Sequence, residues 1–151
     1  MMRLALYQPD IPQNTGTIMR LCAGLGVALD IIEPCGFVLN DKNLKRAGMD
    51  YLEHLDLTRH ISWDAFLAQK QGRLILMEND GAHLYSDFSF QSGDILLAGR
   101  ESAGVPADVV KACAAVVKIP MTPPARSLNV AVASGIILSE ALRQTRWSKK
   151  T

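Results

Sequence analysis

The stretch IPMTPPARSLNVAVASGIIL, residues 119–138, joins an apolar strand to a nearly uncharged helix through a proline-rich loop. Prolines at positions 120, 123 and 124 restrict the backbone of that loop. A stiff loop can hold its carbonyl and amide groups in place for a ligand with little loss of entropy. This stretch therefore predicts a binding loop in front of a buried helix.

The helix after the loop is expected to begin near Ser127 or Asn129, and it is apolar nearly all round from Leu128 to Leu138. A helix without a polar face is covered on more than one side. Small residues would let a second helix approach closely: Ala131, Ala133, Ser134 and Gly135. In a chain of 151 residues this predicts a homodimer. The alternative is a central helix that its own chain covers.

Short apolar runs alternate with helical patterns along the whole chain. The runs are residues 4–7, 28–33, 73–78, 94–99 and 115–120. The helical patterns are residues 14–25, 42–48, 62–69, 106–113 and 127–145. Short, unbroken apolar runs are typical of buried parallel strands. The sequence therefore predicts one α/β domain over residues 1–151, with a mostly parallel sheet and helices on both faces.

Charge and cysteine content give no single functional class. The 16 Lys and Arg residues nearly balance the 15 Asp and Glu residues, so any nucleic-acid contact depends on local clusters. Three cysteines without a C-x-x-C pair favour reduced thiols and a cytoplasmic protein. No apolar stretch approaches the length of a membrane span, and the three histidines lack metal-ligand spacing. Neither a membrane association nor a bound metal is expected.

The loop after the first run leads into a helix with two distinct faces. Asn14 or Thr15 is expected to cap this helix. One face is an apolar stripe of Ile18, Leu21, Cys22 and Leu25. On the other face, Gly16, Arg20 and Gly24 are spaced by four residues, which indicates close packing beside the arginine. The alternative is a solvated Arg20 beside incidental glycines.

The segment DILLAGRESAGVP, residues 94–106, places glycines directly after a strand. Gly99 and Gly104 would let backbone N–H groups approach a ligand between them. The Lys and Ser/Thr of a triphosphate-binding loop are absent after Gly104. Glu101 is either a site residue or a local pairing partner. For the protein as a whole, an ordinary nucleotide-binding enzyme that uses this loop for a phosphate remains an alternative.

Three segments together resemble the motifs of the SpoU branch of the SPOUT RNA methyltransferases. They are NTGTIMR at 14–20, GRESAG at 99–104, and IPM at 119–121 with SLN at 127–129. The chain is also similar, over nearly its whole length, to the TrmL (YibK) type of tRNA 2'-O-methyltransferase, through LYQPDIPQNTGTIMRLC, IIEPCGF and DYLEH.

This resemblance implies a fold, a cofactor and a substrate. The family fold is an α/β domain whose C-terminal segment forms a deep trefoil knot, in a homodimer. S-adenosylmethionine would bind in the knot and become S-adenosylhomocysteine. The substrate would be the wobble nucleotide, position 34, in the anticodon loop of tRNA, with leucine isoacceptors expected and no DNA. The implied cofactor-binding residues are Met77, Gly99, Glu101, Gly104, Ile119, Met121, Ser127 and Leu128.

The resemblance also implies the catalytic residues, which are Arg20, Glu101, Ser127, Asn129 and Asn14. Arg20 would contact the phosphate of the target nucleotide and stabilise charge, since arginine is a poor base. No metal is required. Many relatives have a serine two places after the motif asparagine, whereas this chain has Ala131. A hydrogen bond from that serine is therefore missing.

Basic residues that could contact RNA form two clusters. These are Lys42, Lys45 and Arg46, and Arg143, Arg146, Lys149 and Lys150. Such groups bind phosphates, although solvated helix faces explain them equally well. Two further alternatives are a 2'-O-methyltransferase acting on another RNA site and a catalytically silent, knotted RNA-binding dimer.

Overall fold

The computed structural model describes residues 1–40, 42 and 52–147, and the strands in this part form one seven-stranded parallel sheet. The strand order is β3-β2-β1-β6-β4-β7-β5. The strands are β1 (Arg3–Tyr7), β2 (Ala28–Ile32), β3 (Leu57–His60), β4 (Leu74–Met77), β5 (His83–Leu84), β6 (Ile95–Ala98) and β7 (Ala115–Lys118). In register, Arg3 is opposite Ala28 on one side and Ile95 on the other.

All five strands predicted from apolar runs are present, and two further strands lie at the sheet edges. The strand β3 has the sequence LTRH, and of its residues only His60 is buried. An edge strand of this kind carries no apolar run, which explains why it was not predicted. The other, β5, has only two residues, too few for a recognisable pattern.

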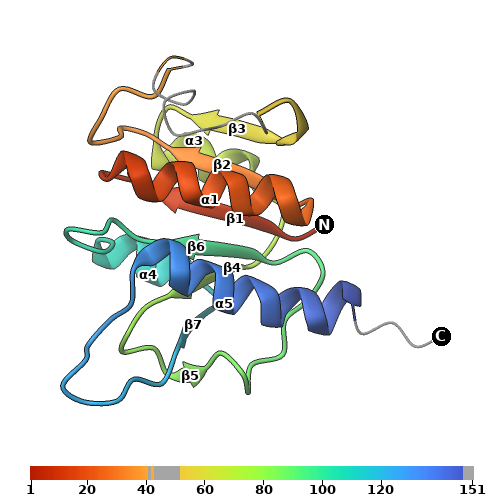
Figure 1. Cartoon of the computed structure of the whole chain (residues 1–151), viewed down its shortest axis with the longest axis vertical. Coiled ribbons are helices and arrows are strands. Elements are labelled where there is room, and N and C mark those ends of the chain that lie inside the picture. Colours follow the sequence, from red (N-terminus) through yellow and green to blue (C-terminus); the bar gives the residue numbers. More distant parts are fainter. Residues whose placement is uncertain (41, 43–51, 148–151) are drawn as a thin grey trace.

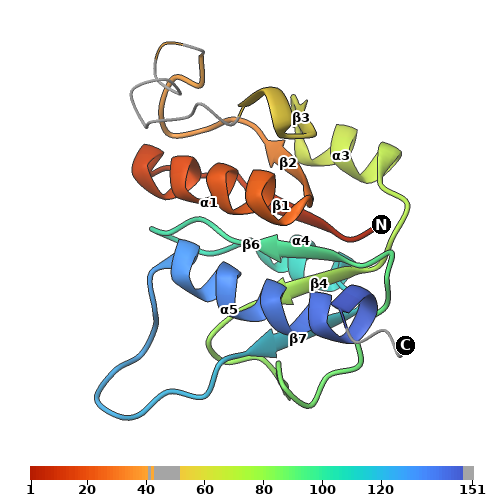
Figure 2. The ribbon, with the colours of Figure 1, turned by 45° about the vertical axis from the view of Figure 1, so that its right-hand side comes forward.

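The helices cover both faces of the sheet, as predicted (Figures 1 and 2). They are α1 (Pro12–Leu25), α3 (Trp63–Gln69), α4 (Ala107–Ala112) and α5 (Val130–Leu142), with a 3-10 turn at Leu52–His54 and a π-helical turn at Arg143–Trp147. The helix predicted at 42–48 lies outside the described residues, except for position 42. No described helix combines the length and the apolar character that crossing a membrane requires.

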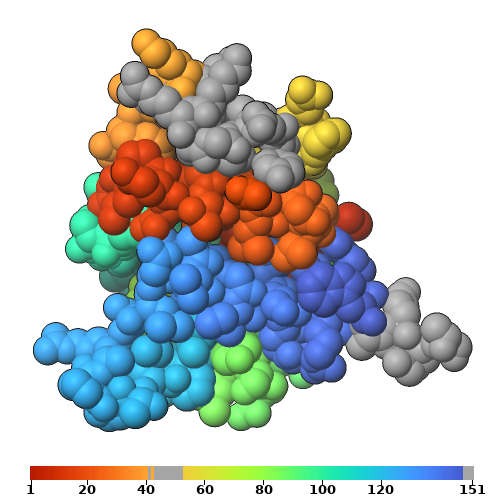
Figure 3. All heavy atoms as spheres, in the orientation of Figure 1, coloured from red at the N-terminus to blue at the C-terminus, as the bar shows by residue number. Residues whose placement is uncertain are grey.

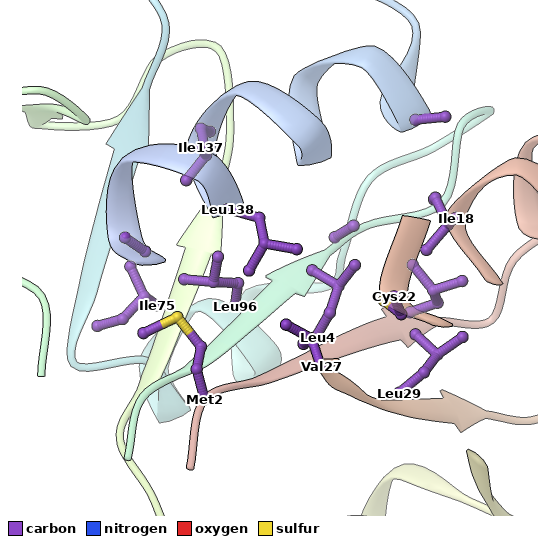
Figure 4. Close-up of a cluster of buried hydrophobic side chains, with 14 of the residues drawn as sticks. Met2, Leu4, Ile18, Cys22, Val27, Leu29, Ile75, Leu96, Ile137 and Leu138 are labelled. Carbon is purple, nitrogen blue, oxygen red and sulfur yellow. The ribbon is translucent and has the colours of Figure 1, made fainter. Parts of the chain in front are cut away.

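Alternating residues of the central strands face two separate cores. Leu4 and Leu6 of β1 pack with α1 and α5, whereas Ala5 and Tyr7 pack on the opposite face with α3 and α4. Figure 4 shows the first core, where Leu138 of α5 and Cys22 of α1 point toward the sheet. A strand buried on both faces lacks polar alternation, which is why the runs are continuously apolar.

The start of α1 differs from the prediction. The helix begins at Pro12, with Ile11 at the N-cap and no side-chain capping bond, so neither Asn14 nor Thr15 caps it. Proline fits the first helical position because it has no N–H to satisfy there. Asn14 therefore lies inside the first turn, and its side chain is available for another partner. At the far end, Gly26 adopts a left-handed conformation (φ 65°) and ends the helix.

The apolar helix α5 is covered by its own chain on two sides. Ile137 and Leu138 are buried against the sheet, and a Cβ built on Gly135 would lie 3.9 Å from Leu21 of α1. The helix that approaches the small residues is therefore α1 of the same chain, and Figure 3 shows the two side by side. The outer side remains open, since Val132 is 52% exposed.

The strand order brings together the segments that follow several of the strands. Strands β2 and β3 extend from β1 in one direction, whereas β6, β4, β7 and β5 extend in the other. In open parallel sheets, ligands bind outside the carboxyl ends of the strands at such a switch point. The segments after β1, β6 and β7 all leave from this end of the sheet (Figure 1).

Candidate active site

A cavity of 480 Å³ lies at the carboxyl ends of β4, β6 and β7, beside the first turns of α1 and α5. All eight predicted cofactor-binding residues line it: Met77, Gly99, Glu101, Gly104, Ile119, Met121, Ser127 and Leu128. They come from three separate segments of the sequence, at position 77, at 99–104 and at 119–128. The volume falls within the range usual for small-molecule sites, about 300–1,000 Å³.

Two of the predicted catalytic residues join the first and third motifs inside this cavity. The Asn129 Nδ2 group donates a hydrogen bond of 2.9 Å to Asn14 Oδ1. Asn129 Oδ1 in turn accepts hydrogen bonds from the backbone N–H groups of Ala131 and Val132, and so caps α5. Of the two residues near which this helix is expected to begin, Asn129 is its N-cap. This arrangement holds the N-terminus of α5 against the first turn of α1.

The turn after β6 closes on itself through its glycines. Arg100 and Gly104 exchange two backbone hydrogen bonds, of 3.0 and 2.8 Å. Gly104 has φ 65°, a conformation that favours glycine. A Cβ on Gly99 would lie only 2.9 Å from the carbonyl carbon of Gly104. The motif glycines therefore permit a tight turn that presents Glu101 to the cavity.

Arg20 is not among the residues that line the cavity. It lies on the exposed side of α1, beside the exposed Gly24. A Cβ on Gly24 would meet nothing within 4 Å, so the close packing predicted there is not made by the described residues of this chain. Of the five predicted catalytic residues, Arg20 is the one that does not line the cavity.

Ala131 and Ser134 both lie on the buried side of α5. Ala131 is 8% exposed and belongs to the apolar core. One turn later, Ser134 lines the cavity and is fully buried, and its Oγ has no hydrogen-bond partner within the described residues. Sequence reasoning treated Ser134 only as a small residue, because helix periodicity does not reveal a cavity.

Charged residues of both signs line the cavity: Glu78, Arg100, Glu101 and Lys118. Of these four, only Glu101 was predicted from the sequence. Burial raises the pKa of Glu78, and the charge of Asp80 adds to this effect. Burial is also the main cause that raises the pKa of Glu101, helped by the nearby Asp10 carboxyl group. A signal for Glu78 existed in its position directly after β4, where ligands bind in such sheets.

Two basic residues of the C-terminal cluster, Arg143 and Arg146, contact other groups of the chain. Arg143 forms an ion pair of 2.8 Å with Glu140. Arg146 Nη1 donates a 2.6 Å hydrogen bond to the Leu25 carbonyl, at the end of α1. Arg146 therefore caps a helix, where a cation is favoured. Lys45, Arg46, Lys149 and Lys150 lie outside the described residues.

The cysteines are poorly suited to nucleophilic catalysis. Burial raises the pKa of Cys22 to about 12 and that of Cys113 to about 11. Both thiols are therefore protonated at neutral pH. Within residues 1–40, 42 and 52–147, no group of three His, Cys, Asp or Glu side chains is placed to hold a metal ion.

A model of the SpoU rRNA Methylase family matches residues 1–139. A tRNA (cytidine(34)-2'-O)-methyltransferase of Beijerinckia indica is 56% identical over 144 residues, covering 93% of this chain and 90% of the relative. A protein of the same name from Escherichia coli K12 is 45% identical over 147 residues, covering 95% and 94%.

Solved structures agree with these matches. One, described in terms of 2-OH methylation of C/U34 on tRNA, has a TM-score of 0.88 and 45% identity, covering 95% of both chains. The SpoU methyltransferase AviRb from Streptomyces viridochromogenes, in complex with AdoMet, has a TM-score of 0.85 and 30% identity, covering 99% of this chain and 61% of that chain. Because a family model and close relatives match along nearly its whole length, the chain belongs to the SpoU methylase family.

Proposed function

We propose that the protein is an S-adenosylmethionine-dependent tRNA (cytidine/uridine-2'-O)-methyltransferase that acts on nucleotide 34 of the anticodon loop. One observation carries the proposal. Residues of the second and third motifs, together with Asn14 of the first motif, line the same cavity. A relative named for this reaction is 56% identical to the chain, which supports the tRNA substrate over another RNA. Leucine isoacceptors are the expected tRNAs.

The cavity suits S-adenosylmethionine. Its apolar side, with Met77, Ile119 and Leu128, would hold the adenosyl group, and the carboxyl groups of Glu78 and Glu101 would favour the positive charges. The buried Ser134 hydroxyl, which lacks a partner within the described residues, is a further group for the ligand. When bound, the cofactor supplies a methyl group on a positively charged sulfur and leaves as S-adenosylhomocysteine.

The protein side chains would orient the ribose and manage its proton. The 2'-hydroxyl oxygen must face the methyl group, and its proton must leave as the new C–O bond forms. Arg20, outside the cavity, would hold the phosphate of the target nucleotide. Ser127 and the Asn14–Asn129 pair would order the cavity wall against which the nucleotide lies.

The test is methyl transfer from labelled S-adenosylmethionine to tRNA from a strain that lacks this activity, followed by nucleoside analysis. The expected product is a 2'-O-methylated nucleotide at position 34. Labelling of ribosomal RNA alone would favour the alternative suggested by the family description. Cofactor binding without transfer to any RNA would favour a silent RNA-binding protein, and preferential binding of nucleotides would favour an ordinary nucleotide-binding enzyme.

The same proposal includes a trefoil knot and a cytoplasmic location. The similarity to SpoU structures supports the knot, as does the long segment 119–129, which leaves β7, lines the cavity and leads to α5 beside α1. Transfer RNA as the substrate supports a protein that works in the cytoplasm.

A homodimer would cover the open side of α5. Val132 is 52% exposed and Trp147 is 48% exposed, at opposite ends of this apolar helix and its π-helical extension. Replacing Val132 by glutamate is expected to convert the dimer to monomer in sedimentation experiments, because a charge would be buried unpaired at the contact. Val110→Glu, on the exposed side of α4, is the matched control and should stay dimeric. A stable Val132→Glu dimer would place the interface elsewhere.

Ser134 is expected to contribute to cofactor affinity. The Ser134→Ala variant should bind S-adenosylmethionine about 5- to 13-fold more weakly in calorimetry, since one buried hydrogen bond is worth about 1–1.5 kcal/mol. Its folding stability should change little, because the hydroxyl has no hydrogen-bond partner within the described residues to lose. Ser139→Ala, on the exposed side of the same helix, should bind normally. Unchanged affinity of Ser134→Ala would show that the hydroxyl does not face the cofactor.

A further inference from the structure

Glu78 is a half-buried carboxylate directly after β4, where it lines the cavity beside Met77. Its backbone is fixed on the sheet, because its N–H donates a 3.0 Å hydrogen bond to the Val117 carbonyl of β7. The chain then turns, and the Gly81 N–H donates a 3.3 Å hydrogen bond to the Glu78 carbonyl. A Cβ on Gly81 would lie 2.9 Å from the carbonyl carbon of Val117, so this turn packs tightly on β7. The end of the sheet therefore sets the position of Glu78.

The Glu78 side chain points toward the turn after β6. A Cβ built on Gly104 would lie only 3.2 Å from Glu78 Oε1. The carboxylate oxygen thus lies beside the Gly104 backbone, and both residues line the cavity. A side chain at position 104 would press on the carboxylate, which gives this glycine a second reason besides its positive φ.

The turn that Glu78 faces is anchored to the loop after β1. The Arg100 Nη1 group donates a 3.3 Å hydrogen bond to Gln8 Oε1. Ser102 Oγ donates a hydrogen bond to Asp10 Oδ2. These contacts hold the turn in place beside the Glu78 carboxylate.

The Glu78 carboxylate has no partner in the described part of the chain. None of the ion pairs there includes Glu78, and no described donor makes a hydrogen bond to its side chain. The cations that line the cavity with it, Arg100 and Lys118, therefore leave its charge unpaired. Burial raises the pKa of Glu78, and the charge of Asp80 adds to this effect. Because an unpaired charge in a partly dry cavity is unfavourable, the carboxylate favours a positively charged ligand.

We propose that Glu78 makes the cavity prefer S-adenosylmethionine over S-adenosylhomocysteine, by placing a carboxylate near the cofactor sulfur. This inference rests on the proposed function. The positive charge on sulfur is the one charge that differs between the two compounds. It has no hydrogen to donate, so a nearby negative charge stabilises it most directly. The ammonium group of the cofactor, in contrast, is balanced by the carboxylate on the same carbon.

Such a preference would help to clear the spent cofactor after each reaction. In the transfer, the ribose oxygen forms a bond to the methyl carbon, and the C–S bond breaks with its electron pair staying on sulfur. The hydroxyl proton leaves to solvent. Since the sulfur is then neutral, the attraction of the Glu78 carboxylate for the ligand is lost. Glu78 would therefore weaken product binding relative to substrate binding.

The test measures the affinities for S-adenosylmethionine and S-adenosylhomocysteine by calorimetry, in the wild type and in Glu78→Gln. Glutamine keeps the shape of the side chain and removes the charge. At about pH 8, where the carboxylate is ionised, the variant should bind S-adenosylmethionine about 10-fold more weakly and S-adenosylhomocysteine within about twofold of the wild type. Its melting temperature should not fall, because Glu78 has no partner among the described residues to lose. Asp80→Asn, at an exposed carboxylate two residues later, is the matched control and should change neither affinity.

Each result decides the proposal. A loss confined to S-adenosylmethionine supports it. Equal losses for both compounds overturn it, because Glu78 would then contact a group that they share. Unchanged affinities, or the same loss in Asp80→Asn, overturn it as well. If any of these overturning results accompanies a wild type that methylates tRNA, the role of Glu78 fails and the proposed function stands, whereas a wild type that binds neither compound refutes the proposed function itself.

Discussion

Replacing Arg20 by alanine is expected to lower kcat/KM for tRNA methylation at least about 100-fold, the usual cost of losing a charge that stabilises a transition state. Arg20 lies on the exposed side of α1 and does not line the cavity. The affinity for S-adenosylmethionine, measured by calorimetry, should therefore stay within about twofold of the wild type. The combination of lost transfer and intact cofactor binding is the specific signature of a residue that acts on the RNA.

Salt dependence and a matched variant separate this role from a structural one. If Arg20 contacts a phosphate, Arg20→Ala should reduce the slope of log affinity for tRNA against log salt by about one. Arg59→Ala, at an exposed arginine of the edge strand β3 that pairs with Glu33, should keep the wild-type rate. Near wild-type transfer by a folded Arg20→Ala protein would show that the arginine is not catalytic.

The central strands of the sheet were predictable because their burial leaves a local and repeated apolar pattern in the sequence. Residues of β1, β4 and β6 are buried on both faces, so their runs are continuously apolar, and the parallel α/β arrangement follows from that pattern. The edge strand β3 was missed for the opposite reason, since Thr58 and Arg59 remain partly exposed. Pattern therefore reveals the centre of the sheet better than its edges.

The cavity was predictable in part, through motifs rather than through periodicity. The glycines at 99 and 104 have a physical signature, a tight turn after a buried strand. Asp10, Arg100 and Ser134 have none, because their importance comes from contacts between segments distant in the chain. Asn14 was assigned as a helix cap because local sequence favours that role, whereas its hydrogen-bond partner, Asn129, is 115 residues away.

Replacing Gly99 by alanine is expected to weaken S-adenosylmethionine binding about 10-fold or more and to destabilise the fold by about 1–3 kcal/mol, the usual cost of an overpacked position. The new Cβ would lie 2.9 Å from the carbonyl carbon of Gly104 and 3.1 Å from Val105 Cγ1. The two nearest atoms belong to the Gly104 backbone, so the turn itself must open. Its two hydrogen bonds between Arg100 and Gly104 would then lengthen, and Glu101 would lose its position at the cavity.

The control for this prediction is the glycine that precedes the same strand. A Cβ on Gly93 would meet nothing within 4 Å, and Gly93 has no positive φ, so alanine fits there without strain. Gly93→Ala should bind the cofactor normally and melt at the wild-type temperature or slightly above, because alanine restricts the unfolded chain. If calorimetry and thermal melting cannot distinguish Gly99→Ala from Gly93→Ala, the tight turn is not what forms the cavity. A loss confined to Gly99→Ala ties cofactor affinity to the closed turn between β6 and α4.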